Sequence, residues 1–240
     1  MSIRPGRTGL ASSGGALGWP SGERTLCEPS GRYLERTVLA IDHVILPVPD
    51  LAVEAARLTA RYGLASVEGG RHPAWGTANW IVPLGDAYLE LVAVADSETA
   101  GRSDFGRWIA SAIPGRPLGW AVRTDSIDAV GRRLGQPVVP GSRVDPRGAL
   151  ITWRSVGLEI AVRESGLPFF IQWGDGVPLP GAAAVRHRAG PATLRHLSLA
   201  ADQERLADWL GDHHLPIAVT GPSGMWAITL TRGQGDFTLE

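Results

Sequence analysis

Three stretches of this chain repeat one order of predicted elements: a strand, a helix and then three strands. The first stretch covers about 40–95, the second about 117–173 and the third about 192–240. Each combines short apolar or alternating runs, which indicate strands, with one segment of helical period. The pattern predicts an α+β fold of repeated βαβββ units whose helices lie on the outside of the sheet.

The first unit shows the pattern most clearly. Residues 39–48, LAIDHVILPV, form a mostly apolar run that predicts a strand. Asp50 is placed to cap an amphipathic helix expected over 51–64. The segment YLELVAVA at 88–95 is expected to form the last strand of the unit, and 104–113 a helix that links it to the second unit.

Composition narrows the class of protein. The formal net charge of −1 over 240 residues gives no global attraction to nucleic acid or to an anionic membrane. No run approaches the roughly 18 apolar residues of a membrane-spanning helix. A single cysteine, Cys27, excludes an intramolecular disulfide framework and a multi-cysteine metal site. We therefore expect a cytoplasmic protein that binds neither nucleic acid nor membrane.

Residues 1–37 differ in composition from the rest. They are rich in Gly, Ser, Pro and Arg and have no sustained period, so we expect a disordered N-terminal extension. The basic start lacks the apolar core of a targeting peptide. A translation start placed too far upstream would also explain the segment. Cys27 lies within it, so a catalytic role for that thiol is not expected.

Six motifs carry a resemblance to a known family. The sequence resembles the vicinal oxygen chelate superfamily, which includes glyoxalase I, extradiol dioxygenases and bleomycin-resistance proteins, and within it the glyoxalase-like domain family. The resemblance assigns 38–175 to a domain of two units and leaves 192–240 as a more divergent third. The motifs are IDHVILPV (41–48), GGRHPAWGTAN (69–79), YLEL (88–91), LGWAVRTD (118–125), GSRVDPRG (141–148) and PFFIQW (168–173).

The resemblance implies that paired units curl into an open half-barrel sheet whose concave floor carries the site. Where such proteins hold a metal, its ligands come from the first and last strands of each paired unit. His43 and Glu90 match those positions in the first unit. A carboxylate in the apolar strand around Glu90 is unfavourable unless it has a partner or faces a wet cavity. Metal ligation, pocket lining without metal and a purely structural role all remain open, and Glu90 is the candidate catalytic residue.

The second unit departs from the ligand pattern. Trp120 stands where the first-strand histidine would be. For the last strand two alignments compete: Glu159 in GLEI matches YLEL locally, whereas Gln172 in PFFIQW matches the family motif. We favour Gln172 and treat 157–167 as an insertion. A tryptophan with an amide offers a stacking surface and a hydrogen-bonding group rather than half of a metal site.

The third unit restores the pattern with His196 in LRHL and Glu240 in FTLE. If the first and third units faced each other, His43, Glu90, His196 and Glu240 would form a two-His, two-Glu site for one divalent ion of Zn, Ni, Mn or Fe. The alternative is that His196 and Glu240 are half-exposed strand residues and that no metal is held.

The glycine-rich segment 69–79 is the most distinctive local motif. Its glycines permit tight turns that could bring Arg71, His72, Trp75 and Asn79 over the cup. The arginine fork would suit a substrate carboxylate, and the indole an apolar or planar ring. The alternative is a well-packed hairpin with incidental polar groups.

Two further family motifs supply candidate ligand-binding residues. Trp173 belongs to PFFIQW and is expected to line the pocket. Arg143 belongs to GSRVDPRG and either faces the ligand or pairs with Asp145.

Three classes of function remain open. The first is a metal-dependent lyase, isomerase or dioxygenase acting on a small organic molecule. The second is a metal-free protein that binds or sequesters such a molecule. The third is a scaffold, because an odd number of units can leave a sheet edge that pairs with a second copy as a homodimer.

Overall fold

The computed structural model describes residues 38–188, 190–222, 226–233 and 235–239. The extension expected over 1–37 and the predicted ligand Glu240 lie outside these ranges. All helices and strands described below belong to one unit of the chain, Thr37–Glu240.

The first predicted unit has the expected order of elements. Asp50 caps the first helix by accepting a hydrogen bond from the backbone N–H of Val53 at 2.9 Å, as its position predicts. The elements are β1 (Leu39–Pro47), α1 (Leu51–Tyr62), β2 (Val67–His72), β3 (Thr77–Leu84) and β4 (Ala87–Val94).

The second unit also has a strand, a helix and three strands, with one helix inserted. Gln172 lies in its last strand, as the favoured alignment predicts, and Glu159 lies in the inserted helix α5. Two helices, α2 (Ser97–Arg102) and α3 (Asp104–Ser111), link the units. The elements of the second unit are β5 (Gly119–Thr124), α4 (Ile127–Leu134), β6 (Val139–Val144), β7 (Leu150–Val156), α5 (Leu158–Arg163) and β8 (Phe169–Trp173).

Units one and two together form an eight-stranded barrel with the order β1-β4-β3-β2-β6-β7-β8-β5. β1 and β5 join the halves along an antiparallel pairing that runs from Leu39 to Ile45 on β1. At the other edge one pair, Arg71 with Val144, joins β2 to β6. The expectation of an open half-barrel is therefore wrong in this respect, because the sheet closes.

Gly70 explains how the second edge can close. Its φ of 140° lies in a region that L side chains rarely adopt, and a Cβ there would overlap the backbone carbonyl of Val144. The absence of a side chain thus lets β2 approach β6 next to the single bridging pair.

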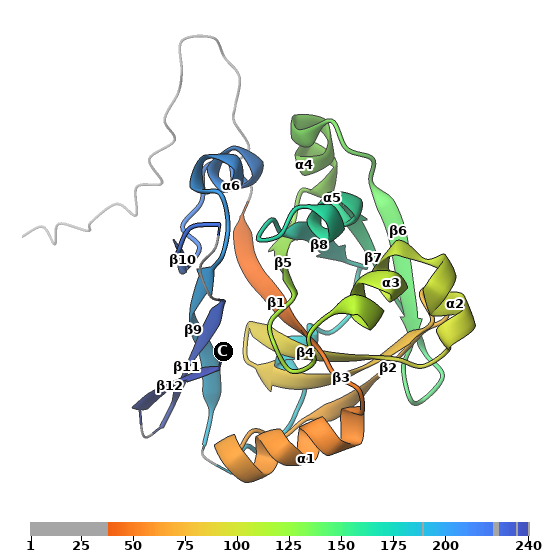
Figure 1. Ribbon diagram of the computed structural model, residues 1–240, viewed down its shortest axis with the longest axis vertical. Coiled ribbons are helices and arrows are strands. Elements are labelled where there is room, and N and C mark those ends of the chain that lie inside the picture. The colour runs from red at the N-terminus through yellow and green to blue at the C-terminus, as the bar shows by residue number, and fades with distance from the viewer. Residues whose placement is uncertain (1–37, 189, 223–225, 234, 240) are drawn as a thin grey trace, which may run out of the picture. The chain divides into compact units, whose positions relative to one another are not determined.

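The third segment forms a separate four-stranded sheet with the order β10-β9-β11-β12, which lies beside the barrel in Figure 1. Leu197, Leu199 and Ile228 of this sheet share a hydrophobic core with Leu84 and Leu91 of the barrel. A short 3-10 helix, η1 (Pro180–Ala182), lies in the crossing segment before it. The sheet consists of β9 (Ala192–Leu199), β10 (Ile217–Val219), β11 (Ala227–Arg232) and β12 (Gly235–Leu239), with α6 (Gln203–Leu210) after its first strand.

The barrel strands are apolar almost throughout because both of their faces are buried. In β1 every residue from Ile41 to Pro47 is buried. One face of the strand contributes Ile45 to a core inside the barrel, and the other contributes Val44 to the core shared with the helices and the second sheet. A polar side chain on the inner face therefore has to find a partner or face a cavity.

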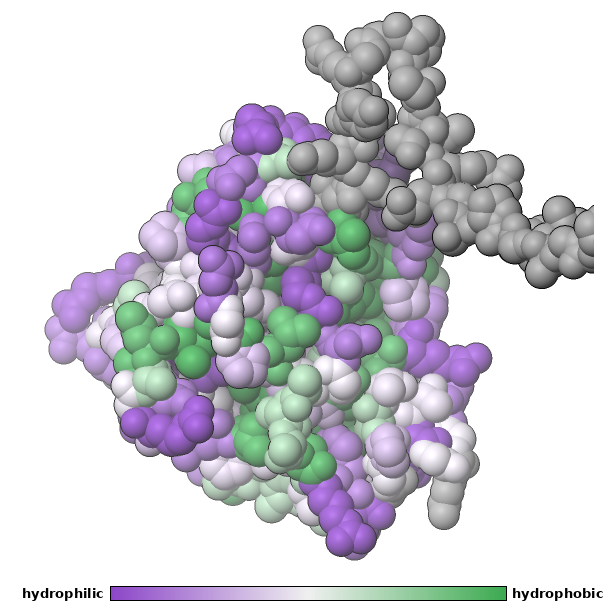
Figure 2. Space-filling model, turned by 180° about the vertical axis from the view of Figure 1, so that it is seen from behind, coloured by the Kyte–Doolittle hydropathy of each residue, from purple (hydrophilic) through white to green (hydrophobic). Residues whose placement is uncertain are grey.

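The outer surface is mixed in character. On the face turned away from the viewer of Figure 1, hydrophobic residues occur in small groups between hydrophilic ones (Figure 2). Within the described part of the chain, no helix is long and apolar enough to cross a membrane.

Candidate functional site

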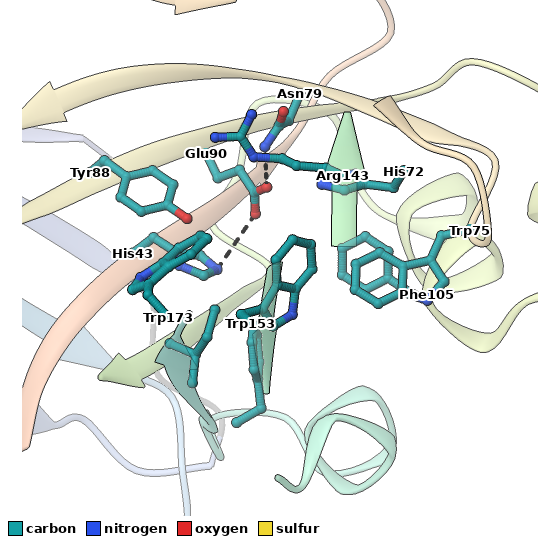
Figure 3. A pocket seen from close by; sticks show the side chains of 12 residues that line it. His43, His72, Trp75, Asn79, Tyr88, Glu90, Phe105, Arg143, Trp153 and Trp173 are labelled. Carbon is teal, nitrogen blue, oxygen red and sulfur yellow. Dashed lines mark hydrogen bonds and ion pairs between the residues drawn. The ribbon is translucent and has the colours of Figure 1, made fainter. Parts of the chain in front are cut away.

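A small pocket lies in the interior of the barrel (Figure 3). Both halves of the barrel, helix α3 and the turn between β2 and β3 contribute to it. Its lining contains seven residues that the sequence singled out: His43, His72, Trp75, Asn79, Glu90, Arg143 and Trp173. The other lining residues are Tyr88, Phe105, Trp153, Phe169 and Ile171.

His43 lies between two carboxylates. Its Nδ1 is 2.7 Å from Oδ1 of Asp42, and its Nε2 is 3.5 Å from Oε2 of Glu90. All three side chains are buried. The register of β1 against β5 shifts between Ile41 and His43, and an irregularity of this kind re-aims side chains. Asp42 and His43 thus contact each other although they are neighbours in one strand.

The two carboxylates decide the charge of the imidazole. Burial lowers the pKa of His43, but the hydrogen bond with Asp42 and the charges of Glu90 and Asp42 outweigh it, and the pKa is raised above its usual value of 6.5. The protonated ring can donate to both carboxylates at once. His43 therefore links Asp42 to Glu90 through two charge-assisted contacts.

The second oxygen of Glu90 also has a donor. Nδ2 of Asn79 donates to Oε1 of Glu90 over 2.6 Å. This orientation of the amide turns Oδ1 of Asn79 toward Gly69, where it is enclosed. Among the described residues, Oδ1 of Asn79 is the buried side-chain polar atom that lacks a hydrogen-bond partner. The amide of Asn79 is thus arranged for the carboxylate, with its own oxygen left unsatisfied.

Tyr88 supplies a neutral hydroxyl to the same pocket. It lies two residues before Glu90 on β4 and therefore on the same face of the strand. Its ring stacks on His43 with a centroid distance of 4.7 Å. Burial raises the pKa of the Tyr88 phenol well above 10, so the group keeps its proton and can act as a donor.

Arg143 brings a cation into the pocket from β6. Its side chain is buried, and it donates a hydrogen bond to the backbone carbonyl oxygen of Gly69 on β2. Figure 3 shows the guanidinium on the side of the pocket where Asn79 and Glu90 lie.

An aromatic wall closes the pocket. The ring centroid of Trp153 is 6.0 Å from that of Trp75 and 5.6 Å from that of Trp173. His72 packs edge-on against Trp153, and its Nδ1 is 3.0 Å from the hydroxyl oxygen of Thr77. Burial lowers the pKa of His72 to about 4, so this ring is neutral near pH 7.

A larger groove lies on the other side of this wall. The inner pocket has a cavity volume of about 30 Å³, and the groove has a volume of about 770 Å³. Trp75, Trp153 and Trp173 line both. These three tryptophans therefore separate the polar centre of the barrel from the outer groove.

Comparison with known families decides the classification. The family described as "Glyoxalase-like domain" matches residues 41–214. This chain belongs to the glyoxalase-like domain family. The resemblance to this family that the sequence motifs indicate is confirmed. No curated protein matches the sequence.

The solved structures similar to this glyoxalase-like domain have low sequence identity to it. A hypothetical protein from Staphylococcus aureus has a TM-score of 0.64 and 14% identity, over 85% of this chain and 99% of its own. Methylmalonyl-CoA epimerase from Mycobacterium tuberculosis has a TM-score of 0.40 and 20% identity, over 55% and 85%. A Streptomyces coelicolor methylmalonyl-CoA epimerase in complex with 2-nitronate-propionyl-CoA gives 0.42 and 18%, over 57% and 97%. The first of these likenesses concerns the fold alone.

Three predicted ligand-binding residues of the glyoxalase-like domain do not line the inner pocket. Trp120 is fully buried on the opposite face of β5, and its indole N–H donates to the Gly166 carbonyl at 2.8 Å. Gln172 also faces outward: its side-chain oxygen accepts from the backbone N–H of Ile127 at 3.1 Å, and the residue lines the groove. Arg71 is exposed on β2. Adjacent strand residues face opposite sides, which places these side chains away from His43.

The predicted four-ligand site is not assembled among the described residues. Within the barrel, the first unit pairs with the second rather than with the third. His196 lies on β9 in the separate sheet, opposite Thr229 of β11, and does not line the pocket. Glu240 is outside the described ranges, so its place in the prediction stays untested.

The second half of the barrel offers apolar residues where a metal would need ligands. In the first half His43 pairs with Tyr88, and Glu90 follows two residues later. In the second half Ala121 pairs with Phe169, and Ile171 follows two residues later. Ala121 and Ile171 thus occupy the positions that correspond to His43 and Glu90. Within the described ranges, no group of three His, Cys, Asp or Glu side chains is placed to hold a metal ion. The residues present do not fit a metal held by four protein ligands.

Several pocket residues, and Asp42 beside His43, were missed from the sequence although a signal existed for most of them. Tyr88 shares a strand face with Glu90, and Phe169 and Ile171 share one with Trp173, so the two-residue period marks all three. Asp42 interrupts an apolar run next to His43, a pattern that calls for a partner. Trp153 and Phe105 carry no comparable local signal, because an aromatic residue in a strand or helix is usually core.

Proposed function

We propose that the pocket binds a small organic molecule and that Glu90 transfers a proton to or from one of its carbon atoms, as in an isomerase or lyase. One observation carries this proposal: a buried carboxylate faces a cavity, and each of its oxygens has a fixed neighbour, His43 for Oε2 and Asn79 for Oε1. General base catalysis requires a carboxylate that its neighbours hold in position.

The residues of the pocket suit the steps of such a transfer. A C–H bond next to a carbonyl group breaks, its proton goes to an oxygen of Glu90, and the electron pair moves onto the carbonyl oxygen. The neutral hydroxyl of Tyr88 can donate to that oxyanion, and a donor that is already in place stabilises the transition state. Return of the proton to another carbon gives an isomer, and departure of a neighbouring group gives an elimination. The aromatic wall keeps bulk water away from these groups.

The alternative is a binding protein that performs no reaction. It is supported by the three tryptophans of the wall, which offer stacking surface, and by the ion pairs that already occupy His43, Asp42 and Glu90. Under this alternative the polar centre orients a ligand and stabilises the fold around it.

Proton exchange distinguishes the two functions. We suggest two benzyl ketones in D₂O, phenylpyruvate and 1-phenyl-2-propanone, with loss of the benzylic proton signal followed by NMR. The wild-type protein is expected to accelerate exchange of at least one of them above the buffer rate. Glu90→Gln should lower this rate by roughly 10²- to 10⁴-fold, the usual contribution of a general base. Glu98→Gln, at an exposed position on α2, should leave it unchanged.

Tryptophan fluorescence supplies the second readout. A fluorescence response to either ketone without accelerated exchange would support the binding alternative and overturn proton transfer. A response with exchange that survives in Glu90→Gln would show that another group is the base.

A further inference from the structure

Arg143 is a buried cation that forms no ion pair with the described residues of the site. The residue is 8% exposed, and its side chain donates a hydrogen bond to the backbone carbonyl of Gly69. No carboxylate among the described residues lies within ion-pair distance of it. Asp145, the partner considered from the sequence, pairs with Arg147 instead. A guanidinium this buried is unfavourable without an anionic partner.

The other charges of the site are already matched. Asp42 and Glu90 flank His43, and the second oxygen of Asp42 lies 3.3 Å from a nitrogen of Arg123. Arg143 therefore remains as a cation that these contacts do not compensate.

The donors of Arg143 that are not bonded to Gly69 face the pocket. A guanidinium carries five N–H groups, and the contact with Gly69 occupies one nitrogen. The other guanidinium nitrogens have no hydrogen bond within the described residues, yet they are not fully enclosed by protein atoms. They therefore reach open space. Arg143 lines the inner pocket, which provides that space. A fork of this shape matches a carboxylate in two parallel hydrogen bonds.

The barrel fixes this fork beside the proposed base. Gly69 accepts the hydrogen bond of Arg143 and also lies against the amide of Asn79, which donates to Glu90. The neighbouring residue Val144 makes the single pair that joins β6 to β2. The closure of the barrel therefore places a cation and a base at the same end of one cavity (Figure 3).

We infer that the ligand of this pocket is a carbon acid that carries a carboxylate, with Arg143 binding the carboxylate and the reactive carbon held at Glu90. An apolar, flat group on the other side of the reactive carbon would lie against Trp75 and Trp153, which lead to the outer groove. This inference rests on the proposed function and adds the class of substrate to it.

A matched pair of ligands tests the carboxylate. Phenylpyruvate and 1-phenyl-2-propanone share the benzyl ketone and differ in a carboxylate against a methyl group. The wild-type protein should prefer phenylpyruvate by at least about 10-fold in Kd from tryptophan fluorescence, as expected for hydrogen bonds to a charged group in a buried site. Pyruvate and acetone repeat the comparison without the ring.

Variants of Arg143 assign the preference to this residue. Arg143→Met should bring the ratio of the two Kd values close to one, and Arg143→Lys should retain part of it because the charge remains without the fork. The ratio is measured within each variant, so a partial loss of folded protein does not change it. Arg147→Gln, on the exposed turn of the same hairpin, should keep the wild-type ratio.

The possible outcomes separate this inference from the proposed function. Equal affinity of the wild-type protein for both ketones, with exchange dependent on Glu90, would overturn the carboxylate and leave proton transfer standing. A preference for phenylpyruvate that persists in Arg143→Met would overturn the role of Arg143. An Arg143-dependent preference without exchange would support the carboxylate and overturn proton transfer. No response to any of the four compounds would overturn both.

Discussion

The indole N–H of Trp173 donates to Oδ2 of Asp42 over 3.0 Å, and Oδ1 of the same carboxylate holds His43 at 2.7 Å. One buried carboxylate thus joins the aromatic wall to the imidazole. Because Trp173 also lines the outer groove, a ligand that displaces it would act on the partner of His43. This contact makes Asp42 a positioning residue, although it does not line the pocket itself.

The first prediction concerns Asp42→Asn. The substitution removes the group whose hydrogen bond and charge raise the pKa of His43, so that pKa should fall. The weakened contacts with His43, Trp173 and Arg123 should also lower the free energy of unfolding by about 1–3 kcal/mol.

NMR titration of His43 and urea unfolding measure the two effects. Asp128→Asn, which alters an exposed pair with Arg154, should change the free energy of unfolding by less than about 0.5 kcal/mol. An unchanged pKa of His43 in Asp42→Asn would contradict the orienting role.

The second prediction is an acid-side loss of stability that His72 causes. Its pKa is about 4 in the folded protein against 6.5 in the unfolded chain, so the unfolded chain binds a proton first as the pH falls. Stability should therefore decrease between about pH 6.5 and pH 4, by up to roughly 3 kcal/mol from this group.

Urea unfolding between pH 4 and pH 7.5 measures this slope. His72→Gln should flatten it, whereas substitution of the exposed His214 by Gln should leave it as in the wild-type protein. A slope that is equally steep in His72→Gln would show that other groups dominate acid unfolding.

The third prediction concerns metal ions. Since Ala121 and Ile171 stand where a second pair of ligands would be needed, protein dialysed against EDTA should keep its fluorescence response to phenylpyruvate and its rate of proton exchange. Metal content should be well below one ion per chain in the wild-type protein and no lower in His43→Ala. If the fluorescence response were lost after EDTA and recovered on adding Zn²⁺, Ni²⁺ or Mn²⁺, the prediction that the site works without a metal ion would be contradicted.

The order of elements could be predicted from the sequence because strand and helix periods are local. The choice between Glu159 and Gln172 for the last strand of the second unit was also correct, since the PFFIQW motif lies in β8. The first unit was equally clear: His43 and Glu90 are polar residues in apolar strands, and both line the pocket. Such a residue stands out wherever its neighbours are uniformly apolar.

The face of a strand was harder to predict when both faces are buried. When LGWAV is matched to IDHVI, Trp120 takes the position equivalent to His43. In the sheet, however, the residue that pairs with His43 is Ala121. A shift of one residue moves every side chain to the other face. Hydrophobicity could not detect the shift, because Trp120 and Ala121 are both fully buried. Closure of the barrel was equally hidden, since one residue pair and one glycine produce it.

The last prediction tests that closure through Gly70→Ala. The added Cβ would overlap the carbonyl of Val144, and φ of 140° is strained for any L side chain. Strain of this kind costs about 1–3 kcal/mol, so the free energy of unfolding should fall by at least that amount. The shift of β2 away from β6 should also weaken binding of phenylpyruvate, because Gly69 holds Arg143.

Gly101→Ala on α2 is the matched control. A Cβ there meets nothing within 4 Å, and alanine is favoured over glycine in a helix, so stability should stay the same or rise by up to about 1 kcal/mol. Urea unfolding and fluorescence titration measure both variants. If Gly70→Ala were as stable as the wild-type protein and bound phenylpyruvate equally well, the bridge between Arg71 and Val144 would not be what holds Arg143 at the pocket.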